Sequence, residues 1–185
     1  MPFDPSDYGP EVRAILALDG DGWRLMPLAE GVCSSSEAAA KLGSVRPRDL
    51  FARARAPEAA LSGLWLYFSC LEQSHSLSQQ IETPEGSFWH GIMHRQEPDP
   101  GNAAYWFRRT GSHPVFEPLR REAGRILEGF PEVDFRLGAA WNPFAFIDFC
   151  ERARRRPGSA EEEAAQLIQR AEWQLLFDYC ARPMR

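Results

Sequence analysis

Three of the four histidines in this 185-residue chain, His75, His90 and His94, lie close together in the sequence. His90, His94 and Glu97 stand at positions i, i+4 and i+7, which places all three on one face of a helix. Two imidazoles one turn apart, with a carboxylate one turn further, can bind zinc, iron or manganese. If a neighbouring helix supplies His75, the four residues together predict a mononuclear site for one divalent metal ion.

A structural role for the histidines is the main alternative. His75 falls on a stripe that is expected to be buried, and Glu72 lies one turn earlier, where it can hydrogen-bond to the ring. His90 and His94 lie away from the apolar side of their own helix, so they face either water or a polar cleft. A ferritin-like di-metal centre is disfavoured, because the stretch contains only one Glu-x-x-His pair.

The same residues are also the candidate catalytic groups. With a metal bound, Glu97 would serve as a fourth ligand or as a general base that acts on metal-bound water. Without a metal, His90 or His94 can exchange protons near neutral pH. We therefore take His90, His94 and Glu97 as candidate catalytic residues and leave open whether the chain is an enzyme.

The segment that follows the histidines combines arginines with tyrosine and tryptophan. An arginine can hold an anion while aromatic rings clamp a planar or sugar-like group, which predicts a small-molecule pocket between the helix near 57–80 and the segment 87–109. The same side chains can instead pin the turn at 99–102, or form the exposed surface of a non-catalytic interaction module. The candidate ligand-binding residues are Trp89, Arg95, Asp99, Asn102, Tyr105, Trp106 and Arg108.

About a third of the chain resembles a family of uncharacterised bacterial proteins with more distant fungal relatives. The resemblance rests on GLWLYFSCLEQSH, IETPEGSFWHGIMHRQEPDPGNAAYWFRR and GSHPVF, which lie between Gly63 and Phe116. Its specific part is the pattern WHxIxHRxExDxxNAxYW. The resemblance implies no activity, but it implies that the family signature includes Trp89, His90, His94, Arg95, Glu97, Asp99, Asn102, Tyr105 and Trp106.

Apolar periodicity and capping signals predict an all-α fold, a globular bundle of about six to eight helices in one domain over residues 1–185. Residues 1–10 are expected to form an extended arm. The segment 57–80 is expected to form one long helix, whose middle, LSGLWLYFSCL, is apolar on every side and therefore central and buried. Other helices are expected near 48–55 and 117–127.

Local signals place the ends of the helix that carries the histidine pair. Thr83 can cap it, with proline at its first position, and Pro98 disfavours helix at the preceding residue. Proline and glycine occupy the central positions of the tetrapeptide 99–102, which predicts a type II turn. Asn102 is then expected to cap the next short helix.

Charge and cysteine usage narrow the class of protein. The net charge of −5 disfavours a broad contact with nucleic acid. No window approaches the ~18 apolar residues of a membrane span, and the acidic, proline-bearing start is unlike a signal peptide. The four cysteines form no CxxC pair, and Cys70 and Cys150 lie in apolar runs where buried free thiols are usual. A reduced, cytoplasmic protein is therefore favoured over the alternative of a protein with disulfides. The oligomeric state is left open.

Overall fold

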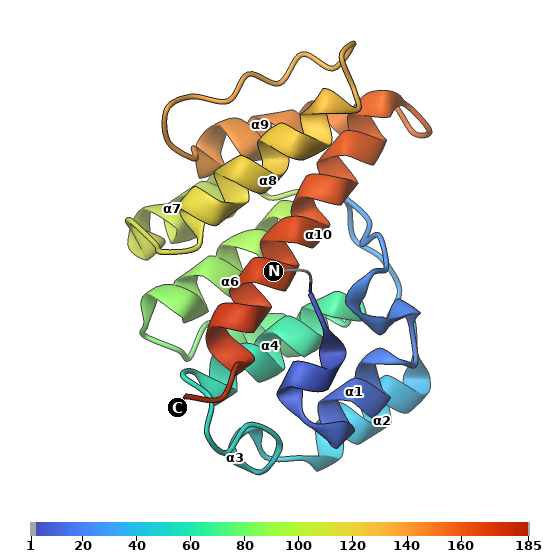
Figure 1. The fold of residues 1–185 in the computed structure, drawn as a ribbon, viewed down its shortest axis with the longest axis vertical. Helices are drawn as coiled ribbons and strands as arrows, with labels where there is room; N and C mark the ends of the chain where they lie inside the picture. Colours follow the sequence, from blue (N-terminus) through green and yellow to red (C-terminus); the bar gives the residue numbers. More distant parts are fainter. Residues whose placement is uncertain (1–2, 185) are drawn as a thin grey trace.

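Proline begins most of the helices in this chain. It occupies the first turn of six of them, where its missing N–H costs nothing and its fixed φ suits the helix. The computed structural model describes residues 3–184, and these form ten α-helices, two short 3-10 helices and no β-strand (Figure 1). The all-α prediction is therefore confirmed, although the helices are more numerous and shorter than expected.

The elements follow one another in this order: η1 (Pro5–Tyr8), α1 (Pro10–Leu16), η2 (Gly20–Gly22), α2 (Ser36–Ser44), α3 (Pro47–Leu50), α4 (Pro57–Tyr67), α5 (Leu71–Ser78), α6 (Pro84–Gln96), α7 (Pro100–Thr110), α8 (Phe116–Glu128), α9 (Pro143–Ala153) and α10 (Ala160–Ala181). The longest helix, α10, runs diagonally across the molecule and packs against α4, α8 and α9 (Figure 1). In Figure 1 the N-terminal helices α1 and α2 lie at the lower end of the molecule, and α8 and α9 lie at the upper end. No helix among the described residues is both long and apolar enough to cross a membrane.

The predicted helix over 57–80 is two helices, and this corrects the expected central element. α4 has every residue buried except Glu58, as the apolar run predicts. The chain then breaks at 68–70, where Ser69 adopts a left-handed conformation with φ of 58°. α5 starts in a new direction and carries His75, so the break decides where this histidine points.

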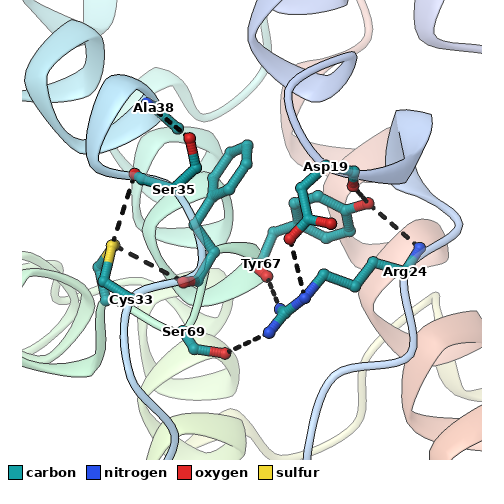
Figure 2. Close-up of a disulfide and its surroundings, with 9 residues drawn as sticks. Asp19, Arg24, Cys33, Ser35, Ala38, Tyr67 and Ser69 are labelled. Atoms are coloured by element: carbon teal, nitrogen blue, oxygen red, sulfur yellow. Dashed lines mark hydrogen bonds and ion pairs between the residues drawn. A yellow bond between two sulfur atoms is a disulfide. The ribbon is translucent and has the colours of Figure 1, made fainter.

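The break between α4 and α5 is held by residues from the N-terminal third of the chain (Figure 2). Arg24 donates from Nη2 to Ser69 Oγ at 3.1 Å and from Nη1 to the Tyr67 carbonyl at 2.5 Å. Cys33 and Cys70 form a disulfide, with their Cα atoms 4.6 Å apart. This bond corrects the expectation of a free thiol at Cys70, whereas Cys150 is a buried free thiol as expected. Cys180 is buried and free as well.

α6 is buried on all sides, from Gly86 to Gln96. Two glycines permit its close packing: the ring of Trp89 lies where a Cβ on Gly63 of α4 would be, within 2.6 Å, and the ring of Phe107 on α7 lies 3.0 Å from the corresponding position on Gly91. The histidine-bearing helix is therefore enclosed by its neighbours, and its polar face meets protein as well as solvent.

Three further local expectations are corrected. The expected arm at 1–10 contains η1 and the start of α1 in its described part, and Tyr8 is buried in the core; residues 1 and 2 lie outside the described range. The expected helix at 48–55 stops at Leu50. No separate type II turn precedes α7, because Pro100 already starts the helix and Asp99, rather than Asn102, caps it.

Candidate functional site

The three histidines of the sequence cluster come together from two helices. His75 projects from α5, and His90 and His94 project from successive turns of α6. The ring centroids are 4.7 Å apart for His75 and His90, 5.4 Å for His75 and His94, and 4.7 Å for His90 and His94. One ring nitrogen from each histidine lies within 4.8 Å of the other two, so the set can surround a single ion after a small contraction.

A carboxylate holds His94 from the side opposite the cluster. His94 Nδ1 lies 2.9 Å from Glu97 Oε2, one turn further along the chain. An ionised carboxylate only accepts hydrogen bonds, so Nδ1 carries the proton and Nε2 keeps a free lone pair. Glu97 is exposed and caps the end of α6, so the structure gives it this orienting role and does not bring it into the predicted ligand set.

A serine performs the corresponding role for His90. Ser78, the last residue of α5, donates from Oγ to the Ser74 carbonyl at 2.7 Å, and the same Oγ lies 2.8 Å from His90 Nδ1. Because the hydroxyl proton is engaged with the carbonyl, we assign the shared proton to Nδ1, which donates to Ser78. The Nε2 atom of His90 is then free to bind an ion.

Burial favours the neutral forms of His90 and His94. His90 is only 1% exposed, and burial together with the two neighbouring imidazoles lowers its pKa to about 3. Burial also lowers the pKa of His94, although Glu97 opposes that effect. Neutral rings are the form that binds metal, whereas a metal-free imidazole with so low a pKa is a weak base at neutral pH.

α7 covers one side of the cluster with an aromatic ring. Trp106 is half-buried, with its ring centroid 4.1 Å from that of His90. The Arg109 guanidinium lies 5.1 Å from the Trp106 ring and also donates to the Tyr105 hydroxyl at 3.3 Å. Tyr105 is 47% exposed, so this part of α7 faces solvent beside the histidines.

Two of the predicted ligand-binding residues lie in the core instead. Arg95 is 1% exposed and forms an ion pair with Glu172 of α10, which is fully buried. Trp89 is also fully buried, packed on Gly63 of α4. The structure therefore removes both residues from the predicted pocket, because the chain supplies partners that enclose them.

Asp99, Asn102 and Arg108, also predicted to bind a ligand, make contacts with other parts of the protein. Asp99 accepts hydrogen bonds from the backbone N–H and the side-chain amide of Asn102, at 3.0 and 2.7 Å, and so holds the first turn of α7. The Arg108 guanidinium lies 5.8 Å from the ring of Phe144, next to α9. Trp106 is the member of the predicted set whose ring packs on a histidine ring of the cluster, and the Asp99 N–H donates to the His94 carbonyl at 2.9 Å.

Two surface cavities lie elsewhere on the molecule. One, of about 870 Å³, lies between the end of α7 and the start of α9 and has Arg108 in its wall. The other, of about 730 Å³, lies between α8 and α10. Neither cavity is lined by His75, His90 or His94. The first includes Phe107 and Arg108 of the segment 87–109 but no residue of 57–80, so neither cavity matches the pocket predicted between these two segments.

Sequence reasoning did not identify Ser78 as the hydrogen-bond partner of His90. It also suggested a hydrogen bond between Glu72 and His75 that the structure does not contain among the described residues. Among the described residues, Glu72 is exposed and makes no hydrogen bond to His75, although its spacing suggested one. The sequence places Ser78 one turn after His75, on the face of α5 that carries this histidine. Serine is common at helix ends, however, so this position alone did not identify Ser78 as a partner of a histidine on another helix. The partner became visible only with the packing of α5 against α6.

Comparisons of the chain with models of protein families, with curated protein sequences and with solved structures find no match. The chemistry of the cluster therefore has to be inferred from its own geometry.

Proposed function

We propose that this protein binds one divalent transition-metal ion, zinc, iron or manganese, through His75, His90 and His94. The observation that carries the proposal is the approach of three imidazole nitrogens to within 4.8 Å of one another from two helices. The Nδ1 partners of His90 and His94 support it, because second-shell hydrogen bonds of this kind fix the tautomer and orientation of metal-binding histidines.

We further propose that the centre is catalytic and acts on a small molecule. Three histidine ligands leave a coordination position for water or substrate, and a metal bound there would polarise a carbonyl or activate water. The protein's own contribution is to orient the rings through Ser78 and Glu97 and to shield His90 with Trp106. If the substrate is anionic, Arg109 is the arginine best placed to attract it, since it lies over Trp106.

The family resemblance and the cellular location belong to the same proposal. We propose that the chain is a member of the family defined by the WHxIxHRxExDxxNAxYW pattern, with His90, His94 and Glu97 as its functional part. We also propose that the protein works in the cytoplasm, without nucleic-acid or membrane partners. The two buried free thiols and the acidic balance of the chain support this location.

The direct test is metal binding by untagged protein. After chelation and removal of the chelator, zinc, manganese and ferrous iron are titrated separately by calorimetry, and melting temperature is measured with and without each ion. We expect one ion per chain and a higher melting temperature with the preferred ion, because an ion that binds only the folded state stabilises it. Each of His75→Ala, His90→Ala and His94→Ala should abolish that binding.

The fourth histidine provides the matched control. His113 is buried outside the cluster, and its Nδ1 accepts a hydrogen bond from the Val115 N–H at 3.3 Å. His113→Asn retains an acceptor there and should leave metal binding intact. A protein that binds none of the three ions, or binds them equally well without His90, would refute the proposed centre.

A non-catalytic interaction module is the second candidate, and the exposure of Tyr105 favours it. This ring and Arg109 form an open aromatic and cationic surface on α7. Tyr105→Ala and Arg109→Ala should then abolish association with a partner and leave metal content unchanged. The three-histidine variants should have the opposite pattern if the metal centre is the functional part.

A further inference from the structure

The helix that carries His75 is covalently anchored at its first turn. Cys70 is the N-cap residue of α5, and its disulfide partner Cys33 lies 37 positions earlier, in the loop before α2. His75 follows Cys70 by little more than one helical turn. A displacement of the start of α5 would therefore be transmitted to the His75 ring.

Other contacts also hold α5 and the break before it. The Cys70 N–H donates to the Trp65 carbonyl at 3.0 Å, and the buried Ser74 exchanges hydrogen bonds with Ser62 of α4 at 3.1 and 3.2 Å. The Ser34 N–H donates to the Phe68 carbonyl at 2.7 Å. Arg24 donates to Ser69 Oγ at 3.1 Å (Figure 2). Both contacts act on the break itself, where Ser69 has a left-handed conformation that L-residues adopt only at a cost. The disulfide is the covalent contact at the N-cap of α5, and it ties this helix to the loop before α2.

We propose that the Cys33–Cys70 disulfide is a redox switch on the three-histidine centre: the bond holds His75 within reach of the ion, and its reduction weakens metal binding. This inference rests on the metal centre proposed above. It also fits a cytoplasmic protein, because disulfides there are usually transient or redox-sensing rather than structural.

The exposure of the two cysteines indicates which sulfur atom a reductant reaches first. Cys33 is half-buried, whereas Cys70 is buried. A thiolate of a dithiol reductant attacks Sγ of Cys33, the S–S bond breaks, and Cys70 leaves as a thiolate that takes up a proton. The second thiol of the reductant then displaces Cys33 as a thiol, so two electrons and two protons pass to the protein and the reductant becomes a disulfide.

The remaining cysteines do not take part in this exchange. Cys150 and Cys180 are fully buried, and burial raises the pKa of the Cys150 thiol to about 12. A buried thiol that stays protonated is a poor nucleophile. The switch is thus confined to a single pair of cysteines.

The test compares oxidised full-length wild type with the Cys33→Ser/Cys70→Ser double variant, which lacks the bond. Serine at these two positions also avoids creating two new thiols that could bind zinc themselves. Zinc affinity is measured by competition with a chromophoric chelator. Hydrogen exchange of the 71–78 amides is measured in the metal-free forms. We expect zinc affinity to fall about tenfold in the double variant, the scale of losing an outer support of a ligand, and exchange at 71–78 to accelerate.

Cys150→Ala is the control, because it removes a buried thiol outside the bond and should keep the affinity of oxidised wild type. Equal zinc affinity in wild type and the double variant would overturn the switch. Zinc binding by none of the forms would instead refute the metal centre, and the exchange data alone would then decide whether the bond orders α5.

Discussion

At the scale of single residues, the imidazoles depend on side chains that do not reach the proposed ion. Glu97 and Ser78 each hold one histidine by its Nδ1 atom, at 2.9 and 2.8 Å. Ser78 belongs to α5 and His90 to α6, so this bond also joins the two helices of the cluster. Glu97 is exposed and local to His94, so it orients a ring without contributing to the core.

Loss of either support should weaken metal binding without abolishing it. Glu97→Ala and Ser78→Ala should each lower metal affinity by roughly tenfold or more, because outer-shell partners fix the tautomer and raise ligand basicity. Calorimetric titration with the preferred ion measures the change. Glu72→Ala is the matched control, since this exposed glutamate of α5 lies near His75 in sequence without bonding to it among the described residues; an equal loss there would contradict the assignment.

Acid should destabilise the metal-free protein through His90. Its folded-state pKa, about 3, lies below the ordinary value of 6.5. Between these two pH values the unfolded chain binds a proton at this residue and the folded chain does not. Stability is therefore fully present above pH 6.5 and is lost as the pH falls from 6.5 toward 3. The linkage relation gives a loss of about 2 kcal/mol between pH 8 and pH 5 from this residue.

Denaturant unfolding at a series of pH values, in the presence of a chelator, measures this loss. His90→Asn keeps a polar group opposite Ser78 but does not titrate in this range. Its stability should therefore fall less steeply between pH 6.5 and pH 5 than that of wild type. Identical slopes for the two proteins would show that His90 is not kept neutral by the fold.

At the scale of elements, the break between α4 and α5 places His75, and Ser69 makes the break possible. A non-glycine residue with φ of 58° costs roughly 1–2 kcal/mol relative to an ordinary conformation. Ser69→Gly and Ser69→Ala both remove the hydroxyl that accepts from Arg24, but only glycine relieves the backbone. We expect the glycine variant to be more stable than the alanine variant by about 1 kcal/mol in urea unfolding; the reverse order would contradict the left-handed assignment.

The same break shows where sequence reasoning reached its limit. Apolar residues on every side of 61–71 predicted a buried helix, and α4 confirms it. The end at Tyr67 was not predictable, because serine carries no signal for a left-handed residue and the groups that hold it, Arg24 and Cys33, are distant in sequence. Spacing predicted the shared face of His90 and His94, because it depends only on helical geometry.

The ligand-binding residues were harder to predict for a related reason. Arginine, tryptophan and asparagine in a row have the composition of a pocket, but the same composition serves caps and buried ion pairs. Whether Arg95 faces a ligand or the core depends on Glu172, which α10 supplies from a position 77 residues away. Local sequence patterns do not contain that information, so Arg95 and Trp89 were placed in the wrong environment.

At the scale of the whole molecule, one buried ion pair connects α6 to α10. Arg95 Nη1 donates to Glu172 Oε1 at 3.3 Å, and Nη2 donates to the other carboxylate oxygen and to Gln169 Oε1. The guanidinium also lies 4.5 Å from the ring of Phe146 on α9. The histidine-bearing helix α6 therefore meets α9 and α10, from the other half of the chain, at its own charged residue Arg95.

Breaking this pair on one side should be more harmful than removing it entirely. Arg95→Met leaves Glu172 without its counter-charge, and burial, which already raises the pKa of this carboxyl, would then act unopposed. We expect each of Arg95→Met and Glu172→Leu to lower the free energy of unfolding by about 3–5 kcal/mol, because Glu172 in the first variant must stay unpaired or take up a proton, and Arg95 in the second variant keeps an unpaired charge in the core. The double variant Arg95→Met/Glu172→Leu should recover much of that loss, since two apolar side chains replace two desolvated charges. Denaturant unfolding of the four proteins as a double-mutant cycle measures the coupling; additive losses would mean that the two charges do not stabilise each other and that the core is held by its apolar contacts alone.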